Sequence, residues 1–237
     1  MKDQGVNKIK MAEMNKINFK KTALILIDMQ NESTPNGFWK TYGWDNIVIN
    51  AKKVLEQARK INLPIIFVRV AGRVDGIDTY EYCPTDENGN RVYSVRGTDS
   101  VEIVDELKPG PEEIIVEKQR FSAFYQTNMD LVLRRLKVQE LIMLGVYTDS
   151  CFLTSVYDAF TRDYRISIIK DACGAGTEAA HKTSIIDMAN WIYGCRIFKT
   201  EEMIKAMENR AYKCWQWEKA HSMPYTTKNI DEVYEKI

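Results

Sequence analysis

The chain has 237 residues, of which 45% are apolar and 28% are charged, the composition of a globular protein with a sizeable core. Lysine plus arginine and aspartate plus glutamate both number 33, so the formal net charge is zero. This balance argues against a nucleic-acid partner or an anionic membrane, which require a basic surface. The apolar runs are of strand length and too short to cross a bilayer, so we expect no membrane partner.

The N-terminus and the cysteines predict a cytoplasmic protein. The first residues, MKDQGVNK, lack the apolar core of a signal peptide. The cysteines are odd in number and no two have C-x-x-C spacing, which argues against a disulfide framework and a zinc knuckle. They are Cys83, Cys151, Cys173, Cys195 and Cys214.

Short apolar runs alternate with helical patterns along most of the chain. This alternation is typical of an α/β fold, in which helices cover both faces of a parallel sheet. Residues 71–100 show no clear period, and an excursion of that length is usually functional. The sequence predicts strands at 22–28, 64–70, 113–118, 140–144, 164–170 and 195–198, and helices at 44–61, 128–136, 151–162 and 178–193.

Three parts follow one another along the chain. Residues 1–20 are polar and rich in lysine and asparagine, and we expect them to form an N-terminal arm. Residues 21–204 hold all the predicted strands and form one domain. Residues 205–237 carry Trp215 and Trp217 without regular periodicity. We expect this C-terminal appendage to pack on the domain or on a neighbouring subunit.

Cys151 follows the predicted strand at 140–144 through a short turn and begins a helix. Amides and the dipole at a helix N-terminus stabilise a thiolate, so this position predicts an activated cysteine that reacts with thiol reagents before the other four. A lone cysteine is more often a small buried hydrophobic residue than a nucleophile. Position alone therefore leaves both interpretations open.

Two further residues occupy equivalent positions at strand ends. Asp28 closes the first predicted strand and Lys118 closes the third. Because central parallel strands end at one edge of a doubly wound sheet, both side chains could meet Cys151 there. A thiolate attacks a carbonyl, a carboxylate moves its proton to the leaving amine, and a cation supports the charge separation. Taken singly, Asp28 could cap a turn and Lys118 could be a solvated lysine.

Three segments in this order resemble the isochorismatase-like cysteine hydrolases, which include nicotinamidases and the N-carbamoylsarcosine, ureidoacrylate and biuret amidohydrolases. The segments are ALILIDMQN (23–31), EKQRFSAF (117–124) and GVYTDSC (145–151), with a weaker match at KDACGAG (170–176). The resemblance spans about residues 20–203. It leaves the arm and the appendage outside.

The resemblance implies a three-layer Rossmann-like domain with a six-stranded parallel sheet of order 3-2-1-4-5-6. It implies that Asp28 deprotonates Cys151 and that Lys118 pairs with Asp28. The family has a non-proline cis peptide that would here join Val146 to Tyr147, and the amides of Tyr147 and Cys151 would form the oxyanion hole. No cofactor is implied, and family members are commonly dimers or tetramers, so we expect a homo-oligomer.

The expected reaction is hydrolysis of a C–N bond in a small amide, carbamoyl or ureido compound through a thioester. Nicotinamidases bind a metal through histidines, but no histidine lies between Asp28 and Lys118, so no metal is expected. Two alternatives stay open. One is a vinyl-ether hydrolase, against which Cys151 argues, and the other is a catalytically silent binding subunit, against which the intact triad argues.

The sequence indicates less about the substrate than about the triad. Carboxylate-selective members of the family place an arginine after the fifth strand, and residues 171–177 contain none. Whether Arg73 or Arg120 reaches the pocket is left open, and Cys83 receives no role. Residues beside the motifs are expected to bind substrate: Gln30, Phe38, Trp39, Phe124 and Tyr147.

Overall fold

The computed structural model describes residues 16–237. Most of the predicted arm, residues 1–15, lies outside the described part of the chain. Ile17 is buried, and the 3-10 helix η1 (Phe19–Lys21) leads directly into the first strand. Ile17 and the partly buried Phe19 therefore pack against the domain, whereas Lys16, Asn18 and Lys20 are exposed.

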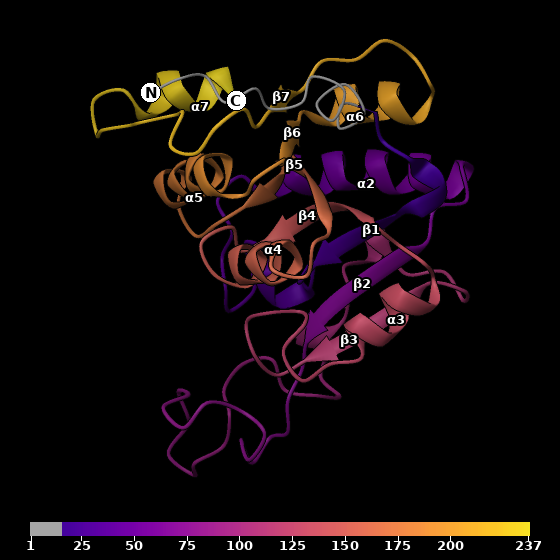
Figure 1. Ribbon diagram of the computed structural model, residues 1–237. Helices are drawn as coiled ribbons and strands as arrows, with labels where there is room; N and C mark the ends of the chain where they lie inside the picture. The colour runs from indigo at the N-terminus through magenta and orange to yellow at the C-terminus, as the bar shows by residue number, and fades with distance from the viewer. Residues whose placement is uncertain (1–15) are drawn as a thin grey trace.

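A mixed sheet forms the centre of the molecule, with the strand order β3-β2-β1-β4-β5-β6-β7 (Figure 1). The first six strands are parallel and have the predicted order. The seventh is a two-residue strand that pairs antiparallel with β6. A strand this short has no periodicity, so the sequence did not predict it. The bounds are β1 (Thr22–Ile27), β2 (Ile65–Val70), β3 (Ile114–Lys118), β4 (Glu140–Val146), β5 (Arg165–Gly174), β6 (Arg196–Phe198) and β7 (Trp215–Gln216).

Helices cover the sheet on both sides, with α2 and α6 on one side and α4 and α5 on the other (Figure 1). Within residues 16–237, no helix combines the length and the apolar character that a membrane span requires. The α-helices are α2 (Trp44–Lys60), α3 (Met129–Arg135), α4 (Cys151–Phe160), α5 (Glu178–Trp191), α6 (Thr200–Met207) and α7 (Ile230–Lys236), and the further 3-10 helices are η2 (Asn31–Ser33), η3 (Asp99–Val101) and η4 (Asp105–Leu107).

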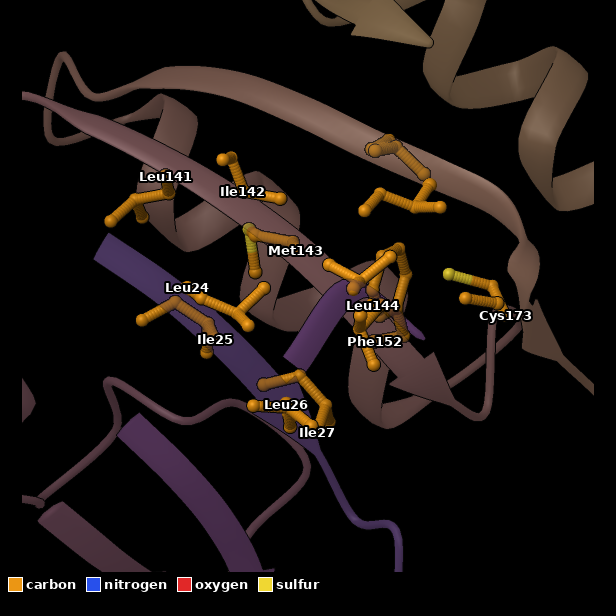
Figure 2. Close-up of a cluster of buried hydrophobic side chains, with 14 of the residues drawn as sticks. Leu24, Ile25, Leu26, Ile27, Leu141, Ile142, Met143, Leu144, Phe152 and Cys173 are labelled. Carbon is orange, nitrogen blue, oxygen red and sulfur yellow. The ribbon is translucent and has the colours of Figure 1, made fainter. Parts of the chain in front are cut away.

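The core is built around β1 and β4, whose residues are all buried. Their continuous apolar sequences suit central strands that are covered on both faces. Figure 2 shows side chains of these two strands in one cluster with Phe152 of α4 and Cys173 of β5. The pairing places Ile27 opposite Gly145. Both strands therefore end at the same level, which brings the residues that follow them together.

The C-terminal appendage packs on the domain. Its strand β7 extends the sheet, and the Trp217 ring lies 4.8 Å from the Tyr193 ring, centroid to centroid. Helix α7 packs against α5. Neither α6 nor α7 was predicted from the sequence, because both are short, with eight and seven residues.

Candidate active site

The carboxyl ends of the central strands bring the three predicted catalytic residues together. The Lys118 ammonium lies 2.8 Å from Oδ2 of Asp28 and donates a hydrogen bond to Sγ of Cys151 at 3.2 Å. A third contact, to the carbonyl of Arg120 at 3.2 Å, holds the ammonium in place. The contact between Asp28 and Lys118 is an ion pair between two buried side chains. The Asp28 carboxylate also interacts with the Cys151 thiol.

Burial controls the charges of this triad. It raises the pKa of the Cys151 thiol to about 12, although the Lys118 charge acts in the opposite direction. Burial likewise raises the pKa of Asp28 against the effect of Lys118. Burial lowers the pKa of Lys118, but the charges of Asp28 and Cys151 outweigh it, so that the pKa is raised. Burial thus favours the neutral thiol of Cys151, whereas the Lys118 charge favours the thiolate.

The backbone around the triad has two unusual conformations. Asp28 has φ of 50°, a left-handed conformation that turns the chain out of β1. The peptide bond between Val146 and Tyr147 is cis, at the position that the resemblance implied. Within residues 16–237, the amides of Tyr147 and Cys151 donate no hydrogen bond to the protein. Both amides are available to an oxygen atom bound beside the thiol.

A cavity of about 640 Å³ opens above these residues. Asp28, Tyr147 and Cys151 line it, and the excursion at 71–100 supplies the opposite wall. The space suits a small molecule. Its lining residues from the excursion are Thr79, Tyr80, Tyr82, Cys83, Pro84, Arg91, Tyr93 and Ser94.

The predicted substrate-binding residues divide into two groups. Trp39 and Tyr147 line the cavity, whereas Gln30, Phe38 and Phe124 do not. The Gln30 side-chain amide bonds the backbone of Val70 and Val101 and joins β2 to η3. The Phe124 ring is buried beneath the guanidinium of Arg162, 4.9 Å away. Phe38 is about half exposed; it stacks on Tyr93 and makes an edge-to-face contact with Trp39 beside the cavity.

Sequence reasoning missed a carboxylate and an arginine in the cavity wall. Glu32 is buried and accepts hydrogen bonds from the amide and the hydroxyl of Ser94. Burial raises the pKa of Glu32 against these hydrogen bonds. Arg91 is 5% exposed, and its Nη1 is buried without an acceptor in the described residues. Glu32 lies four residues after Asp28, but nothing in the irregular excursion indicates that Arg91 and Ser94 face it.

The open question about the other two arginines is answered by their positions. Arg120 lines the cavity, where its guanidinium lies 4.8 Å from the centroid of the Tyr80 ring. Its Nη1 donates to the carbonyls of Asp78 and Gln119. Arg73 is exposed, pairs with Asp75 and does not line the cavity.

Residues 22–202 match the isochorismatase domain family. A protein of Arabidopsis thaliana named probable inactive nicotinamidase is 34% identical over 176 residues, which are 73% of this chain and 90% of that protein. The ureidoacrylate amidohydrolase RutB of Rhizobium rhizogenes is 32% identical over 170 residues, which are 64% of this chain and 69% of that protein.

Solved structures share this architecture. A cysteine hydrolase from Pseudomonas syringae pv. phaseolicola superposes with a TM-score of 0.75 at 28% identity, covering 81% of this chain and 95% of that chain. The N-carbamoylsarcosine amidase of Thermoplasma acidophilum superposes with a TM-score of 0.65 at 29% identity, covering 77% of this chain and 98% of that chain. The matched domain includes Asp28, Lys118 and Cys151 and most of the sheet. This chain therefore belongs to the isochorismatase family.

Proposed function

We propose that the protein is a cysteine-dependent amidohydrolase, which cleaves a C–N bond of a small amide, carbamoyl or ureido compound through a thioester. The observation that carries the proposal is the position of Lys118, whose ammonium contacts both Asp28 and Cys151 at the base of the cavity. A thiol, a proton acceptor and a fixed cation are the groups that acyl transfer from an amide requires.

The first half of the reaction forms the thioester. Sγ of Cys151 attacks the carbonyl carbon while the thiol proton passes to the Asp28 carboxylate. The carbonyl oxygen becomes an oxyanion, and the amides of Tyr147 and Cys151 donate to it. Each such donor contributes about 3 kcal/mol to the transition state. Protonated Asp28 then gives its proton to the leaving nitrogen as the C–N bond breaks, so that ammonia or an amine departs.

The second half releases the acid. Asp28 accepts a proton from a water molecule, whose oxygen attacks the thioester carbon. The C–S bond breaks, and Sγ recovers the proton from Asp28. The raised pKa of Asp28 suits both steps, because this carboxylate must take a proton from one group and return it to another.

The relatives support this reaction class, since two carry the names ureidoacrylate amidohydrolase and N-carbamoylsarcosine amidase. A third is named as inactive, so membership of the family does not by itself give activity. The geometry of the triad in this chain favours an active enzyme over a silent binding subunit. Cys151 favours an amide substrate over a vinyl ether, which needs no thiol nucleophile.

The arginines of the cavity favour a substrate with an anionic group. Arg91 and Arg120 both line the cavity, and neither has a carboxylate oxygen within 4.0 Å among the described residues. Glu32 is near Arg91, but both of its oxygens accept hydrogen bonds from Ser94. A buried guanidinium without an ion-pair partner is costly. We propose that a substrate carboxylate binds there, beside the guanidinium groups of Arg91 and Arg120.

We also propose a cytoplasmic location and a homo-oligomeric assembly. All five cysteines are unpaired, which supports the cytoplasmic location that the sequence predicts. The homo-oligomer expected from the family can be tested by sedimentation of the purified protein.

The test is ammonia release from ureides, carbamoyl compounds and simple amides. Each compound with a carboxylate is assayed beside a neutral analogue that lacks it. We expect release by the wild type with at least one ureido or carbamoyl acid, and none above background by Cys151→Ala. We expect Arg91→Met to raise KM for the acid about tenfold or more and to leave KM for its neutral partner within twofold. Release that survives in Cys151→Ala, or no release by the wild type from any compound, would contradict the proposal.

A further inference from the structure

The C-terminal helix α7 lies outside the matched family domain, which ends at residue 202. A line of hydrogen bonds nevertheless joins it to the turn between β4 and α4. The line runs from Tyr234 on α7 through His181 on α5 to Thr148. Thr148 directly follows Tyr147 and stands three residues before Cys151, so the appendage is connected to the turn that carries the nucleophile.

Both contacts along this line are partly buried. Oη of Tyr234 lies 3.0 Å from Nε2 of His181, and Nδ1 of the same ring lies 3.3 Å from Oγ1 of Thr148. Thr148 is fully buried, and its amide donates to the carbonyl of Gly174 at 2.8 Å. Thr148 is thus held by β5 through its backbone and by His181 of α5 through its side chain.

Two lysines hold Tyr234 and its helix in position. Lys170 on β5 is buried, and its ammonium donates to the Tyr234 carbonyl at 2.8 Å and lies 4.2 Å from the centroid of the Tyr234 ring. At the other end of α7, Lys182 pairs with Asp231 at 2.6 Å. A cation at the carbonyl end of a helix is stabilising. These contacts fix α7 on the domain, and with it the position of the phenol oxygen.

We propose that Tyr234 is a positioning residue for catalysis: through His181 it orients Thr148 and so fixes the turn that presents the Tyr147 and Cys151 amides to the oxyanion. This inference rests on the proposed function, since it assigns to the appendage a role in that reaction.

The chemistry of the imidazole explains why the hydroxyl matters. A neutral imidazole carries a proton on one ring nitrogen and accepts at the other. Whichever role Nε2 takes toward the Tyr234 hydroxyl, Nδ1 takes the other toward Thr148, so the two contacts are coupled through the ring. Without the phenol oxygen, the ring can change tautomer or rotate, and the Thr148 side chain loses its fixed partner.

The test compares Tyr234→Phe with Tyr225→Phe. Both substitutions remove one hydroxyl of the appendage that bonds a side chain of α5, but the Tyr225 hydroxyl bonds Asp187 at 3.1 Å and has no part in the line to Thr148. For Tyr234→Phe we expect kcat to fall roughly tenfold, within the ~100-fold that a 1 Å displacement can cost, with KM unchanged within twofold. For Tyr225→Phe we expect kcat within twofold of the wild type.

Two further measurements separate positioning from general stability. Thr148→Val should lower kcat as Tyr234→Phe does. The kcat of the double variant should be no lower than that of either single variant, because both substitutions remove hydrogen bonds of the same series. Amide hydrogen exchange over residues 146–151 should become faster in Tyr234→Phe and not in Tyr225→Phe, a readout that requires no substrate.

The outcomes are distinguishable. Equal losses of kcat in the two tyrosine variants, or wild-type kcat and wild-type exchange in Tyr234→Phe, would overturn the role of Tyr234. A wild-type protein that releases no ammonia, with faster exchange confined to Tyr234→Phe, would overturn the proposed reaction and support the connection between α7 and the turn.

Discussion

The ammonium of Lys118 lies 2.8 Å from the carboxylate of Asp28, and the two side chains are 0% and 4% exposed. Removing one member of a buried ion pair leaves the other without compensation. The same ammonium donates to the Cys151 sulfur. One side chain therefore supports both the base and the nucleophile.

Lys118→Met should abolish most of the activity while keeping the side-chain volume. Asp28 without its cation should remain protonated and unable to accept the thiol proton, so we expect kcat/KM to fall by about 10³-fold or more. The control is Lys53→Met, which removes the exposed pair with Glu201 and should leave kcat/KM unchanged. Activity within tenfold of the wild type in Lys118→Met would refute the role of the ion pair.

As the pH is lowered, the activity should be lost at a pH above the ordinary pKa of an aspartate. Asp28 accepts the thiol proton only when ionised, and burial raises its pKa from the ordinary value of 3.8. As pH falls through that raised pKa, the protonated fraction grows and kcat/KM declines. A profile of kcat/KM against pH checks this. An acid limb centred at or below 3.8 would show that Asp28 is not the base.

His181 should make the folded state sensitive to acid. Burial, followed by the charges of Lys170 and Lys182, lowers the pKa of His181 from 6.5 to about 4. The unfolded chain therefore binds a proton that the folded one does not, and stability is lost as pH falls from 6.5 toward 4. The loss is at most about 3 kcal/mol, reduced by the partial exposure of the ring. Urea unfolding at several pH values should show this dependence, and His181→Gln should flatten it.

Gly145 should tolerate no side chain. Its φ is 121°, and a Cβ would lie 2.1 Å from the carbonyl oxygen of Ile27, the residue before Asp28. Gly145→Ala should force β1 and β4 apart and lower the unfolding free energy by about 3 kcal/mol or more. In Gly110→Ala, where the nearest atom is 3.5 Å away and belongs to a side chain, thermal unfolding should change little. Equal melting temperatures for the two variants would contradict this reading of the strand contact.

The sheet and the triad could be predicted because their signals are local. Continuous apolar runs identify β1 and β4. Asp28 directly follows β1, Lys118 ends β3, and Cys151 begins the helix after β4. The order of the six parallel strands came from the family resemblance and agrees with the structure. The balance of burial and charge at Cys151 could not be predicted, because the helix N-terminus is visible in a sequence, whereas burial is not.

The cavity wall could not be predicted because distant contacts determine it. Ser94 faces the cavity because it bonds Glu32, 62 residues earlier in the chain. Arg91 has no periodic neighbours that would place it on a buried face. Gln30 was expected at the substrate, but its amide completes hydrogen bonds of β2 and η3 instead. The individual contacts of the appendage could not be predicted for the same reason, since Tyr234 is placed by residues of β5 and α5.

The most direct test of the covalent mechanism compares Cys151→Ala with Cys195→Ala, assayed with the best substrate of the panel. Both thiols are buried and burial raises both pKa values to about 12, but Cys195 does not line the cavity. We predict that Cys151→Ala loses turnover by about 10⁴-fold or more, while Cys195→Ala stays within threefold of the wild type. Turnover by folded Cys151→Ala above one tenth of the wild-type rate would contradict a cysteine nucleophile.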